Sequence, residues 1–330
     1  MFLWQCFFAL LSAFAITAIT GPLVIPVLRK LKFGQSIREE GPSWHGKKQG
    51  TPTMGGVMFI AGIAASTLIF GFRELVQGDT AGYISLAVAA IFGIIGFCDD
   101  YIKVVKKRNL GLTVLQKIVL QALTSAAFIL YLQLKYQIST MVYLPFVGRS
   151  VDLGALYYFF AMFAMLAIVN SVNLTDGIDG LAASVTAPIA LFFVFAANMR
   201  VGEVSYPGSW GTGIFAAAVA GGCVGFLLYN FHPAKVFMGD TGALFLGGAV
   251  TAMAFSLNMP VIVVVVGAVY LVEALSVVLQ VGWFKLTKKR LFKMSPIHHH
   301  FEMEGWSETR IVAVFTAVTV LMCVIAYFGI

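Results

Sequence analysis

Long apolar stretches alternate with short polar segments along most of this chain of 330 residues. A helix needs about 20 apolar residues to cross the roughly 30 Å hydrocarbon core of a bilayer. Ten stretches reach or approach that length and are predicted to be membrane-spanning helices: residues 2–28, 54–72, 81–98, 114–134, 153–172, 181–198, 212–230, 243–258, 261–284 and 311–330. The eighth is short, and little more than Pro260 separates it from the ninth. The pattern therefore predicts an all-α, polytopic membrane protein.

The composition supports this prediction. The chain is 59% hydrophobic and only 11% charged, whereas soluble domains carry about 25% charged residues. The first apolar stretch is too long for the core of a signal peptide and has no basic residues before it, so we expect it to be retained as a span. No linker or internal repeat divides the sequence, and we expect one integral membrane domain covering residues 1–330.

Basic residues predict the orientation. Eighteen of the 22 lysines and arginines lie in the loops that follow odd-numbered stretches or at the start of the fourth stretch. The remaining four are Arg73, Lys135, Arg149 and Arg200. Because basic loops stay in the cytoplasm, the odd loops are predicted to be cytoplasmic and both termini to lie outside. The net charge of +7 is therefore mostly explained by orientation in the membrane and requires no nucleic acid partner. The positive charge not explained in this way favours binding of anionic lipid headgroups or anionic substrates at the inner face.

Acidic residues also gather on these predicted cytoplasmic loops, which the distribution of basic residues does not explain. Asp99 and Asp100 are adjacent at the end of an apolar stretch, and adjacent carboxylates repel unless a cation or a lysine compensates them. Lys103 follows Asp99 by four residues, so a helix would bring both onto one face. Taken alone, an exposed pair of this kind is more often two solvated aspartates at a helix end, and the other acidic loops change that balance.

Two further acidic loops follow. Asp176 and Asp179 each precede a glycine in a loop without basic residues. Such residues also form turns and caps, but two uncompensated carboxylates at a bilayer surface favour a polar site. Asp240 lies between glycines, where an open backbone would let a carboxylate approach a metal or phosphate closely. Phe237 is interpreted either as a stacking platform for a nucleobase or as an interfacial aromatic residue.

The remaining polar loops add cations and histidines. Lys48 precedes a segment of glycines and hydroxyl residues, which could bind phosphate through its charge and through free backbone N–H groups at a helix start, or could simply be a basic turn. Three consecutive histidines begin at His298, and they cannot all point one way; one or two could contact phosphate or transfer protons. Glu273 lies deep in the ninth stretch and is expected to face the protein interior.

These groups together indicate phosphoryl transfer. Carboxylates with Mg²⁺ orient and neutralise phosphate oxygens, while lysine and histidine share the remaining charge. A site at the membrane face suits one soluble and one lipid substrate. We interpret Asp240 as the metal ligand, because it lies alone between glycines whereas Asp99 and Asp100 have Lys103 as a neighbour. The adjacent pair is then predicted to serve the lipid phosphate.

Motifs on four of these loops resemble those of the polyprenyl-phosphate N-acetylhexosamine 1-phosphate transferases. They are Asp99-Asp100-Tyr-Ile-Lys103, Asn173-Leu-Thr-Asp176-Gly-Ile-Asp179-Gly, Val236-Phe-Met-Gly-Asp240-Thr-Gly and Pro296-Ile-His298-His-His300-Phe-Glu. The segment from Gly50 to Gly56 and the stretch from the histidines to Trp306 resemble the members that use UDP-MurNAc-pentapeptide. The resemblance implies ten helices in a bacterial cell membrane, and Mg²⁺-dependent transfer of phospho-MurNAc-pentapeptide to undecaprenyl phosphate at the cytoplasmic face. The products would be lipid I and UMP.

The resemblance also implies roles for individual residues. The predicted catalytic residues are Asp99, Asp100, Asp240, which also binds Mg²⁺, and His298. The predicted substrate-binding residues are Lys48, Thr53, Lys103, Asn170, Asn173, Asp176, Asp179, Asn230, Phe237, His299 and His300. Two residues depart from the family pattern: Ala243 replaces a usual serine, and Glu304 replaces a usual lysine. The sequence does not determine the oligomeric state, for which a homodimer is one option.

Two other functions compete with this interpretation. A sister enzyme would use UDP-GlcNAc, but the His-His-His-Phe-Glu stretch argues against that substrate. An ion-coupled transporter would carry ionisable groups near the bilayer midplane and interrupted helices in paired halves. Only Glu273 lies deep in a predicted span, and the other acidic residues lie in or near loops, so the sequence favours the transferase.

Overall fold

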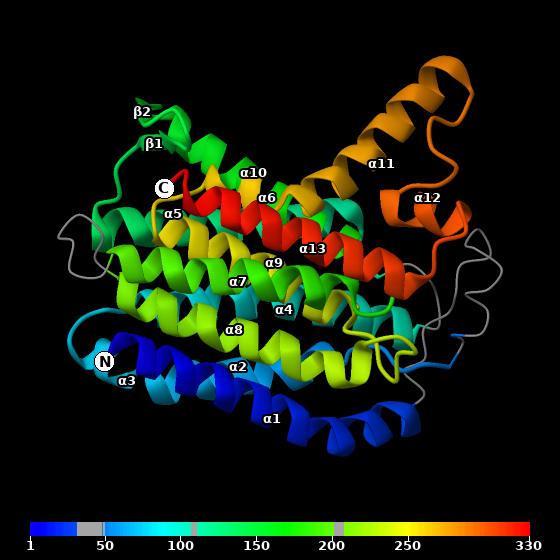
Figure 1. Ribbon diagram of the computed structural model, residues 1–330, viewed down its shortest axis with the longest axis horizontal. Coiled ribbons are helices and arrows are strands. Elements are labelled where there is room, and N and C mark those ends of the chain that lie inside the picture. The colour runs from blue at the N-terminus through cyan, green and yellow to red at the C-terminus, as the bar shows by residue number, and fades with distance from the viewer. Residues whose placement is uncertain (32–47, 49, 107–110, 201–207) are drawn as a thin grey trace.

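The computed structural model describes residues 1–31, 48, 50–106, 111–200 and 208–330, which form a bundle of helices with one small hairpin (Figure 1). The helices are α1 (Phe2–Lys30), α2 (Gly56–Phe70), α3 (Phe72–Val76), α4 (Ala81–Val105), α5 (Val114–Tyr136), α6 (Leu156–Thr175), α7 (Leu181–Arg200), α8 (Ser209–Asn230), α9 (Gly239–Ser256), α10 (Ile262–Val266), α11 (Ala268–Thr287), α12 (Ile297–Met303) and α13 (Glu308–Tyr327). Strand β1 (Met141–Leu144) pairs antiparallel with β2 (Arg149–Asp152), with Met141 opposite Asp152.

Eight of the described helices are long and apolar enough to cross a membrane, namely α1, α4, α5, α6, α7, α8, α11 and α13. The prediction of a polytopic helical membrane protein is therefore confirmed at this level. Helix α2 is apolar but has only 15 residues, and α9 has 18 residues with Asp240 in its first turn. The count of ten spans stays a prediction.

Several predicted boundaries differ from the structure. The predicted span 54–72 stops at Gly71, and α3 follows it. The predicted span 261–284 is divided at Gly267, where α10 ends before α11 begins. Glycine is a poor helix former because its backbone loses the most conformational freedom on folding. In the opposite sense, α4 continues past Cys98 to Val105, so the adjacent aspartates lie on the helix.

The centre of the bundle is α9, whose residues from Thr241 to Phe255 are buried. Helix α4 packs along α9, while α8 packs between α1 and α7. Small residues permit such close packing of apolar helices. At Gly96 in α4, an added Cβ would collide with the backbone oxygen of Asp240 at the start of α9. A glycine at this position therefore lets α4 bring its next turn directly against the first turn of α9.

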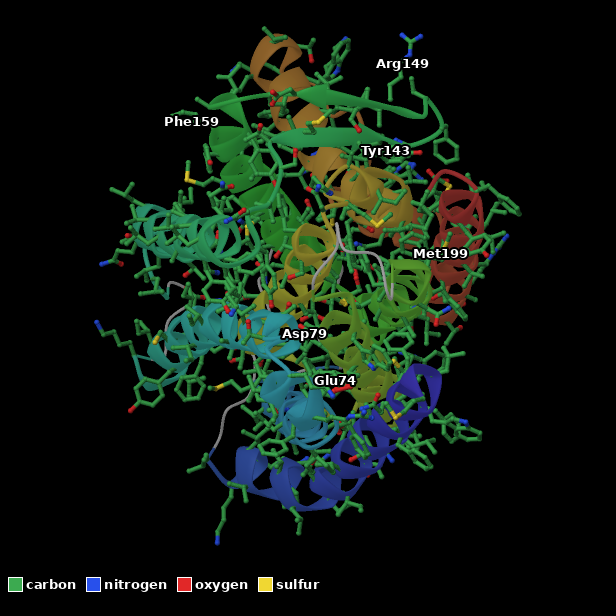
Figure 2. All side chains as sticks on the ribbon, turned by 90° about the vertical axis from the view of Figure 1, so that its left-hand side faces the viewer. Glu74, Asp79, Tyr143, Arg149, Phe159 and Met199 are labelled. Carbon is green, nitrogen blue, oxygen red and sulfur yellow. The ribbon has the colours of Figure 1, made fainter. Side chains whose placement is uncertain are left out.

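Both chain termini lie at one end of the bundle, and α12 lies towards the other (Figure 1). Figure 2 looks onto the end that carries the termini, where Glu74, Asp79 and the hairpin residues Tyr143 and Arg149 are labelled. The common end for both termini agrees with an even number of crossings. Which end faces the cytoplasm stays a prediction from the basic residues.

Candidate active site

Three aspartates from two helices meet where α4 passes the start of α9. Asp99 and Asp100 come from α4, and Asp240 comes from the first turn of α9. One carboxylate oxygen of each lies within 4.8 Å of the others. We call these three residues the carboxylate cluster. The expected convergence of the adjacent pair with Asp240 is thus present in the structure.

Two lysines balance most of this charge. Lys103 Nζ lies 2.6 Å from Asp99 Oδ2 and 2.9 Å from Asp240 Oδ2, which confirms the predicted pairing across one helical turn. Lys117 Nζ lies 2.7 Å from Asp240 Oδ2 and 3.6 Å from Asp99 Oδ2. The expectation that Asp240 stands apart from lysine was wrong, because α5 delivers Lys117 to it. Both aspartates therefore share the same two cations.

Asp240 has partners on both carboxylate oxygens. Asn173 Nδ2 in α6 donates to Asp240 Oδ1 at 2.9 Å, while Oδ2 accepts from the two lysines. Burial alone would raise the pKa of this carboxyl, but its hydrogen bond with Asp99 and the charges of Lys117 and Lys103 hold the pKa below its ordinary value. Asp240 is thus ionised and compensated by cations.

Asp100 has a different environment from its neighbour. Its Oδ2 accepts from the backbone N–H of Thr241 at 2.9 Å and from the Thr241 hydroxyl at 2.7 Å. Its Oδ1 accepts from the backbone N–H of Asp240 at 3.2 Å. These N–H groups belong to the first turn of α9, where backbone N–H groups have no acceptor within the helix. Asp100 therefore holds Asp240 in place in this structure, and its predicted catalytic role stays a prediction.

Thr53 borders the same place. A Cβ built on Gly239 would lie 2.6 Å from Asp100 Oδ2 and 2.7 Å from Thr53 Oγ1. Both side chains therefore lie next to Gly239 and leave no space for a larger residue there. By contrast, Asn170 lies one turn before Asn173 on α6 and donates to Gln121 Oε1 at 2.8 Å. It links α6 to α5 rather than entering the carboxylate cluster.

A second group of charges surrounds Lys48. Its Nζ lies 2.7 Å from Asp179 Oδ1 and 2.7 Å from Glu308 Oε2. The backbone N–H of Asp179 also donates to Glu308 Oε2 at 2.9 Å, and His232 Nδ1 lies 2.9 Å from Asp179 Oδ2. We call Lys48, Asp179, His232 and Glu308 the lysine cluster. It joins the first, fifth, seventh and ninth predicted loops.

Asp176 is affected by the charges of both clusters. It follows the last residue of α6. Burial raises the pKa of its carboxyl to about 8, with further contributions from the negative charges of Asp240, Asp100 and Asp179, while Lys48 opposes the shift. Its carboxyl is therefore largely protonated at neutral pH when no cation is bound nearby.

Asn230 and Phe237 hold the loops together. Asn230 is buried; its Oδ1 accepts from Gly180 N at 3.1 Å, and its Nδ2 donates to the carbonyl oxygen of Val236 at 3.0 Å. The carbonyl oxygen of Phe237 accepts from Gly55 N at 2.8 Å. Similarly, Gly56 N donates to the carbonyl oxygen of Met238 at 3.1 Å. The expectation of free N–H groups at the start of α2 was wrong for these two glycines.

The three histidines lie on α12 and diverge, as expected from the 100° turn between successive helical residues. His298 is fully buried, with Nδ1 3.0 Å from Glu273 Oε2, so Glu273 does face the interior. His299 Nδ1 lies 2.6 Å from Glu302 Oε2. His300 Nδ1 accepts from Lys293 N at 3.3 Å. These contacts connect the histidines to α11, to the loop between α11 and α12, and within α12. Their predicted roles with substrate stay predictions.

Sequence reasoning missed three contributors. No role is predicted from the sequence for Lys117, Glu308 or His232, yet they contact Asp240, Lys48 and Asp179, respectively. A lysine one turn inside an apolar stretch, as Lys117 is after its helix cap Thr113, is the one pattern that could have indicated a buried partner. Nothing local distinguishes Glu308 or His232.

Comparisons with known proteins agree with these motifs. The profile of glycosyl transferase family 4 matches residues 83–258, and a phospho-N-acetylmuramoyl-pentapeptide-transferase signature matches residues 48–60. The phospho-N-acetylmuramoyl-pentapeptide-transferase of Alkaliphilus metalliredigens is 51% identical over an alignment 332 positions long, and the alignment covers 97% of each chain. Those of Clostridium novyi and Acetivibrio thermocellus are 46% and 45% identical and cover 97% and 98% of this chain, and 95% and 94% of theirs. The resemblance inferred from the motifs is confirmed: this chain belongs to glycosyl transferase family 4, among the phospho-N-acetylmuramoyl-pentapeptide-transferases.

Proposed function

We propose that this protein transfers phospho-MurNAc-pentapeptide from UDP-MurNAc-pentapeptide to undecaprenyl phosphate, which yields lipid I and UMP in peptidoglycan synthesis. Family membership and the matched signature support the reaction. The observation that carries the proposal is the carboxylate cluster with Lys103 and Lys117 at the ends of apolar helices. A site at the membrane face would suit one soluble nucleotide substrate and one lipid substrate. The basic residues favour the cytoplasmic face of the bacterial inner membrane.

We propose Mg²⁺ as the cofactor, and the donor set fits it. Mg²⁺ prefers carboxylate oxygens, and three aspartates present oxygens within 4.8 Å of one another. Asp240 would hold the ion with Asp99 beside it, because Oδ2 of each faces lysine ammonium groups that a cation could replace. The oxygens of Asp100 instead accept hydrogen bonds from the backbone and hydroxyl groups at the start of α9. When bound, Mg²⁺ supplies charge stabilisation to the phosphate oxygens and to the UMP leaving group.

The two clusters divide the substrate between them in this proposal. Lys48 and Asp179 in the lysine cluster would contact the UDP-linked substrate, together with Asp176, Phe237 and Asn173, which donates to Asp240. Lys103 and Lys117 would hold phosphate oxygens close to the carboxylate cluster. Asn230 would contribute by fixing the loops on either side, since both polar atoms of its amide are engaged with the backbone.

The lipid phosphate is the proposed nucleophile. A phosphate monoester has a second pKa of about 6, so it is mostly dianionic at neutral pH and needs no strong base. One of its oxygens attacks the β-phosphorus of the UDP-sugar, and the bond from that phosphorus to the bridging oxygen breaks to release UMP. Asp99 positions the attacking phosphate or accepts its residual proton. Direct displacement inverts the configuration at a chiral β-phosphorus, whereas a covalent aspartyl intermediate would retain it.

The decisive experiment measures UMP release from purified protein. We expect release only when UDP-MurNAc-pentapeptide, undecaprenyl phosphate and Mg²⁺ are all present. Equal or greater release from UDP-GlcNAc would instead support the sister activity considered from the sequence. Ion flux in liposomes without UMP release would revive a transporter. Sedimentation in detergent tests the homodimer, which stays a prediction.

A further inference from the structure

A buried histidine–glutamate pair lies outside both clusters. His298 Nδ1 and Glu273 Oε2 are 3.0 Å apart, and both side chains are fully buried. His298 belongs to the short helix α12, whereas Glu273 lies within the membrane helix α11. The other polar atoms of the pair, Nε2 and Oε1, have no hydrogen-bond partner among the residues that the structure describes. Buried polar atoms of this kind are uncommon and require an explanation.

The Nε2 edge of this imidazole meets the loop that carries two predicted substrate ligands. A Cβ built on Gly177 would collide with His298 Nε2 and would lie 2.6 Å from Cε1. Gly177 has no left-handed backbone that would itself require glycine, so the nearby ring is what excludes a side chain there. The imidazole therefore fills the space beside Gly177 and limits where the segment from Asp176 to Asp179 can lie.

Glu273 determines how the ring is oriented. A carboxylate that accepts the Nδ1–H of an imidazole selects the tautomer and fixes the plane of the ring. Without that acceptor, the Nδ1–H would be buried without a partner and the ring could rotate away from Gly177. An ionisable side chain within a membrane helix is costly, and contact with His298 gives Glu273 a reason to be there.

We propose that Glu273 is a positioning residue: it orients His298, whose ring holds the Asp176–Asp179 segment where that segment meets the UDP-linked substrate. This inference rests on the proposed function. It also changes the role expected of His298. Because its ring is enclosed by protein, His298 acts through the loop and not on the reacting phosphates.

Steady-state UMP release by the full-length protein tests the role of Glu273. Glu273→Met keeps the length of the side chain but removes the acceptor, and we expect the KM for UDP-MurNAc-pentapeptide to rise about tenfold, the effect of one lost buried hydrogen bond. The KM for undecaprenyl phosphate should stay within about twofold. Glu273→Gln retains an oxygen that can accept from Nδ1, and it should restore the nucleotide KM to within about threefold.

Glu74 supplies a matched control at the opposite end of the bundle (Figure 2). It is also buried, accepts one hydrogen bond from Gln5 Nε2 at 3.0 Å, and has one oxygen without a partner among the described residues. Glu74→Met should lower stability without changing either KM. If Glu74→Met raised the nucleotide KM as much as Glu273→Met does, general destabilisation would account for both effects and the proposal would fail.

A double-mutant cycle tests the contact itself. Gly177→Ala should raise the nucleotide KM about tenfold in the otherwise unchanged protein, because the new Cβ collides with the ring. In a His298→Ala background, the same change should have almost no additional effect, since the ring is gone. An equal effect in both backgrounds would overturn the proposal, as would an unchanged KM in Glu273→Met. Failure of the unmodified protein to release UMP would instead overturn the proposed function.

Discussion

Replacing Lys117 with methionine tests whether lysine and Mg²⁺ compete for Asp240. The Lys117 ammonium lies 2.7 Å from Asp240 Oδ2, and the side chain is 18% exposed. With three aspartates and two lysines, the cluster has a formal charge of −1, and the variant would have −2. We expect Lys117→Met to be less stable without divalent cations, to bind Mg²⁺ more tightly, and to turn over more slowly because a phosphate ligand is lost.

The distance between Lys117 and Asp240 determines how much stability and Mg²⁺ affinity should change in Lys117→Met. Two unit charges 2.7 Å apart attract by about 6 kcal/mol at an effective dielectric constant of about 20. Loss of one partner from a buried pair costs about 3 kcal/mol, and the partial exposure of Lys117 with Lys103 still in place reduces this to about 2 kcal/mol. That value corresponds to a change of about 30-fold in an equilibrium constant, which is the largest gain in Mg²⁺ affinity that we expect.

Thermal unfolding in detergent measures both effects. The variant should unfold at a lower temperature in EDTA, and the difference should shrink as Mg²⁺ is added in the absence of substrate. Lys135→Met is the matched control, because Lys135 is an exposed lysine in the last turn of the same helix. An Mg²⁺ affinity that is unchanged or weaker in Lys117→Met would refute the competition at Asp240.

Three further predictions concern the carboxylates. Asp99→Asn should abolish turnover while leaving binding of the UDP-linked substrate largely intact by calorimetry; lost nucleotide binding would assign the metal to the adjacent pair. Glu308→Gln should raise the KM for that substrate about tenfold, because Lys48 keeps only Asp179 as a charged partner, and an unchanged KM would contradict this. Burial raises the pKa of Asp176 from 3.8 to about 8, so the folded protein favours the protonated carboxyl. The stabilisation that this group contributes is fully present below pH 3.8 and should be lost as the pH rises towards 8. Thermal unfolding in EDTA should show this loss, and Asp176→Asn should remove it.

Much of the fold follows from the pattern of apolar residues, because a helix in lipid must satisfy its own backbone groups. The pairing of Asp99 with Lys103 also follows from the sequence, since it needs only the helical repeat. The same holds for the divergence of the three histidines. The convergence of the loops follows less directly, from the even alternation of spans and the clustering of acidic residues on one side.

Contacts between distant segments could not be predicted in this way. Asp100 caps a helix that begins about 140 residues later, and no local pattern indicates that partner. The position of Lys117 one turn inside an apolar stretch could indicate a buried partner, but it does not identify Asp240 as that partner. The breaks at Gly71 and Gly267 could not be predicted from glycine alone, because α4 continues without interruption through Gly96.

The charge balance of the two clusters connects these observations to the reaction. Asp240 and Asp99 share two lysines, and Lys48 lies between Asp179 and Glu308. Each cluster therefore has more formal negative than positive charge, although both substrates are anionic. With a divalent cation bound, Asp240 would no longer need both ammonium groups, which would then be available to phosphate oxygens. On this argument the lysines stabilise the protein before substrate arrives and bind substrate afterwards, so Lys117→Met should improve Mg²⁺ binding and impair turnover together.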